Sequence, residues 1–505
     1  MATRNCVNGH ENDINAVFCE TCGMTFIDDI PENSASNQKY TTLNANSNEV
    51  SFFKTHLTKI ISSISIAGLL ILGYTFLLPK LSSSLGSSLS INDKAFLTIS
   101  GSNTMGEEMM PELAKAYMET KLNLKNVSVS KSNNGDIIVS GQGVQGILTI
   151  KIETIGSEKG INKLLKDSCD IAMSSREIKD GEITETVNHS INSEYIIARD
   201  GLAVIVNEEN PIQELSKSDL ADIFSGQKTE WAEFGNYFGT ITILALDQNS
   251  STTSIMETLI LNQDVKKVAP DMQKVESIKD LLNGVAKNKF AIAYVSSSKT
   301  ADMKNLKISG YGMSPIAPSI QTLSTEDYPI SRRMYLYANT KNKGENVQKF
   351  LEFCNSSEAF ESIKKMGFIP NSLECSKAMT PVMDSSQASL YRNLYKGNTC
   401  RLTTTLFFNN RLNQLDNKGL NDISRILAYQ SKNTSKSILL CGFANASGNQ
   451  TVDIARSETL ISIVKKEFES KGVRVESMAV GSSVLVAGKN ASNQNKNNRI
   501  EVWMK

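Results

Sequence analysis

The chain is 505 residues long, which is too long for one ordinary domain and predicts about three or four. Basic and acidic residues balance at 53 each, so the net charge gives no indication of nucleic acid or of another strongly charged partner. Only three histidines occur, His10, His56 and His189. Because histidine is the usual general base near neutral pH, this scarcity argues against a Ser-His-Asp hydrolase, and we expect the protein not to be an enzyme.

The N-terminal segment, residues 1–27, carries four potential metal ligands in a C-x3-H...C-x2-C pattern: Cys6, His10, Cys19 and Cys22. Thiolates and an imidazole this close in sequence suit a tetrahedral zinc ion. So short a segment cannot bury a core, and the metal would supply its folding energy, which is a structural role. The alternative is a metal-free tail with incidental cysteines. The segment resembles the short zinc ribbon at the N-terminus of many bacterial membrane-anchored proteins.

A polar stretch, residues 28–58, is rich in Asn, Ser and Thr and is typical of a flexible linker. The run Ile60–Leu78 that follows contains no charge over nineteen residues. This is about the length that a helix needs to cross a bilayer, so we predict a transmembrane helix over 59–80 and a spacer over 81–94. The alternative is a buried helix of a soluble domain.

The zinc ligands indicate the orientation in the membrane, because thiolates survive best in the reducing cytoplasm. We therefore expect a cytoplasmic N-terminus, a single pass through the inner membrane, and a large periplasmic region. That region holds five cysteines, an odd number that allows at most two disulfides: Cys169, Cys354, Cys375, Cys400 and Cys441. We favour a bond between Cys354 and Cys375, with buried free thiols as the alternative.

From Phe96 onward, apolar strand-like runs alternate with helical patterns. "FLTISGSNTM" and "TILALDQNSSTTSIMETLIL" each lead from an apolar run through a polar corner into a helix, and "GLAVIVNEENP" and "FAIAYVSSS" are further apolar runs. Such alternation predicts an α/β architecture with largely parallel sheets.

Three of the corners are rich in hydroxyl groups and precede helices: Ser102 to Thr104, Gly156-Ser157, and Ser250 to Thr252. In α/β proteins such corners gather at the carboxyl edge of a sheet, where helix starts favour anions. Arg176 would add a full charge and two parallel N–H donors suited to an oxyanion. The alternative is that these hydroxyls are ordinary helix N-caps.

The region from about Ala95 to Leu373 resembles the phosphate-binding protein of bacterial ABC phosphate transporters. The stretches that carry the resemblance are "ISGSNTM", "IGSEKGINKLLKDSCDIAMSSREIKDGE", "DGLAVIVNEENPIQELSKSDLADIFSGQKTEWAEFG", "VAKNKFAIAYVS" and "FLEFCNSSEAFESIKKMGFIPN". The resemblance implies a two-lobed periplasmic-binding-protein fold, type II-like, that closes on its ligand like a hinge. We place one lobe at about 95–200 and 300–373 and the other at about 201–299.

The resemblance also implies a set of phosphate ligands: Ser102, Thr104, Met105, Ser157, Ser175, Arg176, Ser250, Ser251 and Thr252. Two positions depart from the family pattern. Leu246 stands where the family often has a phosphate-contacting arginine, and Ser175 stands where some members have an aspartate that accepts the proton of hydrogen phosphate. Without that acidic acceptor, the rejection of sulfate loses its simplest physical cause.

The C-terminal region begins after a linker over 374–400. Residues 401–505 follow a βαβαβ pattern and resemble the OmpA-like peptidoglycan-binding domain through "CGFANASGNQTVDIARSETLISIVKKEFESKGV" and "NQNKNNRIEV". That family holds the cell-wall peptide between an aspartate and an arginine. Arg456 matches the arginine, but Asn445 replaces the aspartate and cannot offer charge to an ammonium group. The alternatives are wall binding and a degenerate or differently used module.

We therefore predict a single-pass inner-membrane protein that captures or senses an inorganic oxyanion, with phosphate as the first choice. Its expected partners are the oxyanion, the membrane, peptidoglycan and a cytoplasmic protein, but no nucleic acid, and its expected cofactor is structural zinc. The alternative function is an envelope scaffold whose binding domain no longer holds a ligand.

Overall fold

The structure is a computed structural model that describes residues 3–5, 11–13, 95–246, 251–261, 266–300, 302–310, 314–341, 344–377, 386–409, 414–487 and 494–505. The chain divides into two compact units, Met1–Leu89 and Ser90–Lys505. In the first unit, β1 (Thr3–Asn5) pairs antiparallel with β2 (Glu11–Asp13). The predicted zinc ligands, linker and transmembrane helix lie outside the described residues. Within the described ranges, no helix combines the length and the hydropathy that a membrane crossing requires.

The second unit begins with an α/β lobe, lobe 1, built on parallel strands. β3 (Leu97–Gly101) lies between β6 (Gly146–Thr154) and β7 (Ile171–Ser174) and runs parallel to both. The edge of the sheet is an antiparallel extension through β5 (Ile137–Gly143) to β4 (Lys125–Lys131). The helical segments are η1 (Met105–Met109), α2 (Met110–Thr120), α3 (Ser157–Leu165), η2 (Asp180–Glu182), α8 (Glu345–Cys354) and α9 (Ser357–Lys365).

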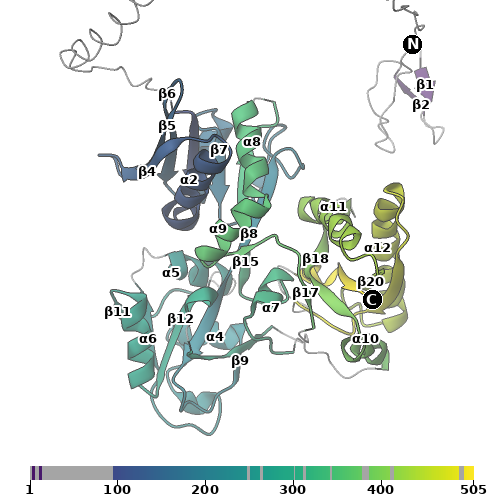
Figure 1. Ribbon diagram of the computed structural model, residues 1–505. Helices are drawn as coiled ribbons and strands as arrows, with labels where there is room; N and C mark the ends of the chain where they lie inside the picture. The colour runs from purple at the N-terminus through teal and green to yellow at the C-terminus, as the bar shows by residue number, and fades with distance from the viewer. Residues whose placement is uncertain are drawn as a thin grey trace, which may run out of the picture. The chain divides into compact units, whose positions relative to one another are not determined.

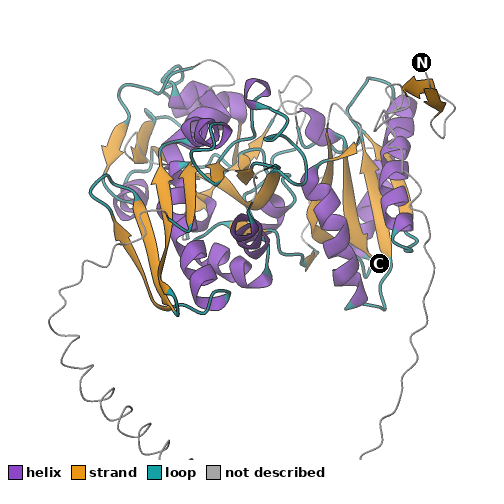
Figure 2. Cartoon of the chain, turned by 90° about the horizontal axis from the view of Figure 1, so that it is seen from above, coloured by secondary structure: helices purple, strands orange, loops and turns teal. Residues whose placement is uncertain are grey.

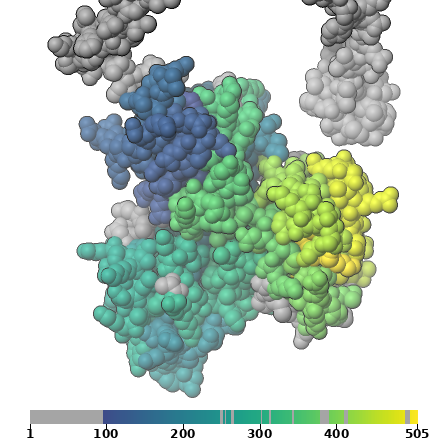
Figure 3. Space-filling model, viewed as in Figure 1, coloured from purple at the N-terminus to yellow at the C-terminus, as the bar shows by residue number. Residues whose placement is uncertain are grey.

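Lobe 1 is assembled from two distant parts of the chain. Helices α2 and α8 lie beside the strands of this lobe (Figure 1), and the space-filling view shows green residues from α8 packed next to dark-blue residues from the start of the lobe (Figure 3). The ring of Tyr117 on α2 meets that of Phe350 edge-on, with centroids 5.2 Å apart. The lobe therefore cannot complete its apolar core until the chain has returned from the second lobe.

Lobe 2 has the same layered design with its own apolar core. Its central strand β10 (Thr242–Leu246) runs parallel to β11 (Gln273–Val275) and β12 (Ala291–Ser296). The remaining strands are β9 (Glu214–Ser216), β13 (Lys304–Asn305) and β14 (Lys307–Ser309). The helical segments are α4 (Lys217–Phe224), η3 (Trp231–Glu233), α5 (Ser251–Met256), η4 (Glu257–Leu261), α6 (Ile278–Lys287), η5 (Ser297–Lys299) and α7 (Ile320–Ser324).

Two long strands connect the lobes. β8 (Glu194–Val206) leaves lobe 1 and β15 (Ser331–Ala338) returns to it, and the two pair antiparallel, with short β16 (Ile369–Pro370) added to β8. In the register of this pair, Arg332 lies opposite Asp200. The return crossing at β15 lies well after the boundary expected near residue 300. The core of lobe 2 includes apolar residues that follow that boundary: Leu306, Ile308, Ile316, Leu323, Tyr328 and Ile330.

The C-terminal domain is a mixed sheet in the strand order β17-β18-β22-β20-β21, with helices alongside (Figure 2). Its strands are β17 (Cys375–Ser376), β18 (Cys400–Asn409), β19 (Gln414–Leu415), β20 (Ile438–Phe443), β21 (Glu476–Gly481) and β22 (Arg499–Met504). Its helical segments are α10 (Ser386–Lys396), α11 (Asn417–Ser431), α12 (Gln450–Ser470) and η6 (Gln494–Asn497). The strands and helices that the sequence predicted over 401–505 are present, and β19 and β21 are additional strands. The stretch 374–400 that was expected to be a linker contains β17 and α10.

One disulfide joins Cys375 to Cys400, so the expected bond between Cys354 and Cys375 is wrong. Cys354 is buried in the core of lobe 1, whereas the register of β17 against β18 brings Cys375 next to Cys400. Cys169, Cys354 and Cys441 are free and buried. The bond therefore ties the strand that leaves the binding lobes to the first long strand of the C-terminal domain.

The carboxylate of Glu153 on β6 gives the fold a dependence on pH. Burial alone would raise its pKa, but hydrogen bonds from Lys163 (2.6 Å), Ser100 and Lys151 (2.9 Å) outweigh burial and lower the pKa to about 2. A carboxylate with a lowered folded-state pKa stabilises the fold above its unfolded value of 4.5, and this contribution is lost as the pH falls toward 2.

We therefore expect Glu153→Gln to flatten the loss of stability between pH 5 and pH 2. Chemical denaturation of the wild type and the variant at several pH values measures this slope. Glu119→Gln, at an exposed position of α2, serves as the control and should leave the slope unchanged. Parallel pH profiles for wild type and Glu153→Gln would contradict the assignment.

Candidate functional site

Two of the three predicted hydroxyl corners, Ser102 to Thr104 and Gly156-Ser157, lie in lobe 1 at one edge of the sheet, beside Ser175 at the end of β7. β3, β6 and β7 are adjacent and parallel, so their carboxyl ends lie side by side. The backbone joins these ends directly, because Ser102 N–H donates to Met173 O (2.9 Å) and Gly156 N–H donates to Gly101 O (2.8 Å). Ser102, Ser157 and Ser175 are therefore the first polar residues beyond three neighbouring strand ends.

Two of the hydroxyl groups at this edge, those of Thr104 and Ser157, do not act as helix caps. The N-cap of α3 is Gly156, which carries no side chain and has φ 90°, a conformation that favours glycine. Ser157 instead accepts a hydrogen bond from Ser175 N–H (3.2 Å), which links the start of α3 to the end of β7. Thr104 precedes η1 but makes no side-chain cap hydrogen bond. The alternative of ordinary N-caps thus fails for Thr104 and Ser157.

Arg176 lies next to this edge, but its guanidinium is already paired. Nη1 lies 2.8 Å from Oε2 of Glu182 and Nη2 lies 2.6 Å from Oε1, which is a two-pronged ion pair. Nη1 also donates to Glu177 O (2.9 Å). Hydrogen bonding to Glu182 raises the pKa of Arg176, so the arginine is charged but committed to the turn that follows β7. Its role as the charged ligand of an oxyanion remains a prediction.

The other four predicted ligands are one residue of lobe 1 and three residues of lobe 2. Met105 is fully buried in the core of lobe 1 and offers the site its backbone only. In lobe 2, Thr252 is buried near the start of α5, whereas Ser251 is described by its backbone alone and Ser250 lies outside the described residues. No hydrogen bond described for the structure joins Thr252 to the corners of lobe 1.

A residue that the sequence analysis missed, Arg332 on β15, contacts the first corner. Its Nη2 lies 3.2 Å from Thr104 Oγ1 and 3.3 Å from Asp200 Oδ2. The side chain is only 8% exposed, and its Nε is buried without a hydrogen-bond partner. The one sequence signal was an arginine pair, Arg332-Arg333, directly before the apolar run "MYLYA", since buried charges in a strand require a reason.

The electrostatics of this pair indicate that its charges are incompletely compensated. Burial lowers the pKa of Arg332, against the opposing effect of Asp200, and burial raises the pKa of Asp200. Both shifts disfavour the charged forms, as expected where one long contact joins a buried guanidinium to a buried carboxylate. An anion that bonded to the unpartnered Nε would satisfy it and add negative charge beside the arginine.

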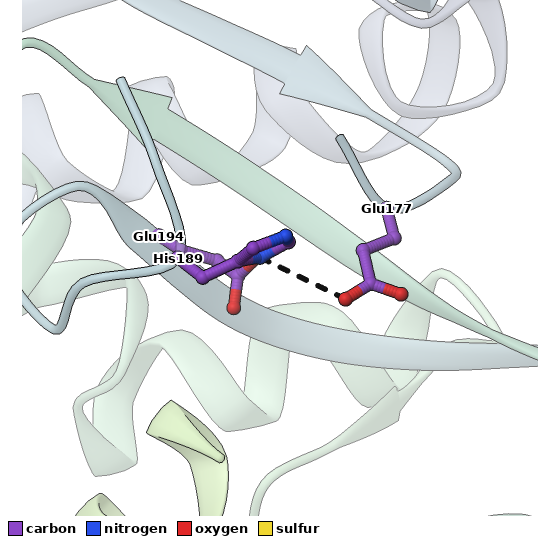
Figure 4. A group of neighbouring side chains, drawn as sticks. All are labelled: Glu177, His189 and Glu194. Atoms are coloured by element: carbon purple, nitrogen blue, oxygen red, sulfur yellow. Dashed lines mark hydrogen bonds and ion pairs between the residues drawn. The ribbon is translucent and has the colours of Figure 1, made fainter. Parts of the chain in front are cut away.

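A second cluster of polar side chains lies at the start of β8 (Figure 4). His189 Nδ1 is 2.9 Å from Glu194 Oε2 and 3.7 Å from Glu177 Oε1, and the three groups offer ligand atoms within 4.8 Å of one another. Glu194 also accepts hydrogen bonds from Tyr337 Oη (3.0 Å) and from Asn417 Nδ2 (3.2 Å). These donors account for both carboxylate oxygens of Glu194, so the cluster joins β8 to α11 of the C-terminal domain.

In the C-terminal domain, the two predicted peptidoglycan ligands differ in exposure. Arg456 is exposed on α12, whereas Asn445 is half-buried and its Oδ1 has no hydrogen-bond partner. Asp453 lies three residues before Arg456, but its oxygens accept hydrogen bonds from Ser447 N–H (2.9 Å) and Ser482 Oγ (2.7 Å). Asp453 therefore fixes the loops around α12.

Comparison with known proteins identifies the family of the two-lobed region. The family described as the PBP superfamily domain matches residues 91–358. The chain is 28% identical over 225 residues to the phosphate-binding protein PstS of Staphylococcus epidermidis, an alignment that covers 42% of this chain and 67% of the relative. It is 29% identical over 208 residues to that of Staphylococcus aureus, covering 39% and 62%. The chain thus spans about two thirds of the length of these curated relatives.

Two solved structures are similar to part of the chain. An ABC-type phosphate transport receptor from Vibrio cholerae is 25% identical, with a TM-score of 0.44 over 54% of this chain and 99% of that chain. PstS from Borrelia burgdorferi is 22% identical, with a TM-score of 0.42 over 55% and 99%. Because the family match covers more than half of the sequence, and because the matched region forms α/β lobes joined by two crossing strands, the chain belongs to the PBP superfamily.

Proposed function

We propose that residues 95–373 bind an inorganic oxyanion, with phosphate as the first candidate. One observation carries the proposal: three adjacent parallel strands end at one edge, where the Ser157 and Ser175 corners meet and Thr104 contacts a buried arginine. Hydroxyl groups and the N–H groups of a helix start are neutral donors that suit an anion. The printed names of the relatives, which are phosphate-binding proteins, support the choice of phosphate.

The charged donor of this site is Arg332 in the proposal, and not Arg176. Arg176 has both terminal nitrogens on Glu182, whereas Arg332 keeps a buried Nε without a partner beside Thr104. Arg332 would thus replace the arginine that the family pattern places at Leu246. Asp200, held beside Arg332, is a buried carboxylate on the same strand pair and restores an acidic group near the site, where the family pattern is broken at Ser175.

The proposal extends to the rest of the chain. The N-terminal segment holds a structural zinc ion in the cytoplasm, and the predicted span over 59–80 anchors the protein in the inner membrane. The C-terminal domain attaches to peptidoglycan through Arg456 and Asn445. A protein tethered at both ends is suited to sensing an oxyanion in the periplasm or to delivering it to a neighbouring permease.

A second candidate function is an envelope scaffold without a ligand. The paired state of Arg176, Leu246 in place of an arginine, and Asn445 in place of an aspartate favour it. Anion binding separates the two functions, since a scaffold has no need of it.

The first test is calorimetry of the full-length protein in detergent with phosphate, sulfate and arsenate. We expect phosphate to bind, and we expect Ser157→Ala to weaken binding about tenfold, because one hydrogen bond to a charged ligand contributes about 1.5 kcal/mol or more. Ser128→Ala, at an exposed position of β4, is the matched control and should bind as the wild type does. An absence of heat with every anion at millimolar concentration would favour the scaffold.

The second test compares the two arginines. In the proposal Arg332 contacts the anion, whereas both terminal nitrogens of Arg176 are bonded to Glu182. We therefore expect Arg332→Met to weaken phosphate binding about a hundredfold and Arg176→Met less than fivefold. Arg332→Lys should recover part of the loss, because it restores the charge without the planar geometry. Thermal melting of each variant confirms that it is folded. The opposite ranking of the two arginines would return the role to Arg176.

The third test concerns the zinc ion. Purified full-length protein should contain about one zinc per chain, and Cys19→Ser or Cys22→Ser should remove it, since a structural site needs all four ligands. His56→Asn is the control, because His56 lies outside the C-x3-H...C-x2-C pattern. Elemental analysis after extensive dialysis measures the metal. Equal zinc content in all the proteins would overturn this part of the proposal.

A further inference from the structure

We propose that the C-terminal domain clamps the hinge between the two lobes and thereby orients Arg332 for anion binding, so that docking of this domain and occupation of the site are thermodynamically linked. The inference rests on the proposed function and goes beyond it, because it gives the C-terminal domain a role in binding.

The crossing strand β15 carries two neighbouring arginines, Arg332 and Arg333, that contact different parts of the structure. Successive side chains of a strand point to opposite faces, so Arg332 and Arg333 face different surroundings. Arg332 reaches Thr104 and Asp200 at the candidate site. Arg333 donates through Nε to Glu326 (2.9 Å) and through Nη1 to Asp416 (2.7 Å), which is the N-cap residue of α11. The backbone that positions the anion-facing arginine is therefore fixed from its other face by the C-terminal domain.

The C-terminal domain holds both lobes. Towards lobe 2, Arg401 of β18 forms a buried ion pair with Asp327, with Nη1 and Oδ2 2.7 Å apart and both side chains at most 1% exposed. Towards lobe 1, Asn417 Nδ2 donates to His189 O and to Glu194 Oε1 (3.2 Å). Contacts on both sides of the crossing strands set the angle between the lobes, and hinge closure is the motion that such an angle controls.

Glu326 is the centre of this arrangement. It lies in the turn before β15, and its backbone is left-handed at φ 60°, a strained conformation for a residue other than glycine. Its buried carboxylate contacts Arg333 and Arg199 (3.4 Å) from the crossing strands and Lys496 (3.7 Å) from the C-terminal domain. Burial alone would raise the pKa of Glu326, but these three cations hold it well below its usual range. The strained turn is thus held in place by charges from both domains.

These contacts preorganise the guanidinium of Arg332 for the anion. If β15 were loosely held, anion binding would have to order the strand, and the lost conformational entropy would weaken binding. Because Arg333 already fixes the strand, this entropy is lost on folding and does not oppose binding. By linkage, whatever strengthens anion binding through docking must also strengthen docking when the anion binds, and by the same factor. Typical coupling between two sites corresponds to a change of about 5-fold to 150-fold in affinity.

The experiment uses the full-length protein, inorganic phosphate and two variants on the C-terminal side of the clamp. Asp416→Asn removes the charge that faces Arg333, while asparagine retains the N-cap bond that Asp416 Oδ1 accepts from Gly419 N–H. Lys496→Met removes the cation that faces Glu326. The matched control is Glu476→Gln, which breaks an exposed ion pair with Lys505 in the same domain.

We expect each clamp variant to weaken phosphate binding by about 5-fold to 30-fold in calorimetry, and the control to change it by less than twofold. We also expect phosphate to slow amide hydrogen exchange at the start of α11 in the wild type and to do so less in Asp416→Asn. Thermal melting identifies a variant that has lost its fold, and the other clamp variant then decides.

Phosphate affinity that is unchanged in both folded clamp variants would overturn the inference while leaving the proposed function intact. A wild type that binds no anion would overturn both. Equal weakening by the clamp variants and by Glu476→Gln would also overturn it, because the loss would then reflect general destabilisation of the domain.

Discussion

The antiparallel pairing of β8 with β15 is the constraint on which the rest of the structure depends. These strands carry the chain from lobe 1 to lobe 2 and back, and lobe 1 cannot complete its core until β15 has returned. The pairing also places Arg332 opposite Asp200 in the middle of the crossing. Buried charges are costly unless they are paired, so their presence at a hinge indicates a role that an apolar pair could not fill. In the proposed function, that role is the binding of an anion that Thr104 and the neighbouring corners would share.

The C-terminal domain contacts both lobes close to the β8–β15 strand pair. Its contacts with the lobes include ion pairs and hydrogen bonds of buried groups, such as Arg401 with Asp327. Charged pairs of this kind give orientation more than they give stability. The disulfide between Cys375 and Cys400 keeps the connection between the lobes and the domain short. Anion capture and attachment to the envelope would therefore meet at one set of strands.

Local sequence patterns were sufficient for the architecture but not for the charged part of the site. Strand runs that end in hydroxyl corners predicted the parallel edge, because that inference needs only alternation and chain order. The sequence did not identify Arg332 as a site residue, because its partners lie 132 and 228 residues away and the local sequence does not show which way a strand arginine points. The disulfide was not predicted for a similar reason, since the register of β17 against β18 decides that Cys375 pairs with Cys400. Arg176 was different: Glu182 is only six residues away and could have been recognised as its partner.

The most direct test of the account is the position of a heavy oxyanion in a crystal of the protein grown with arsenate. Anomalous scattering locates the arsenic atom without assumptions about its ligands. The account places that atom within about 4.5 Å of polar atoms of Thr104, Ser157 and Arg332, the distance that one As–O bond and one hydrogen bond span together. An arsenic peak elsewhere, or well-diffracting crystals without one at millimolar arsenate, would contradict it.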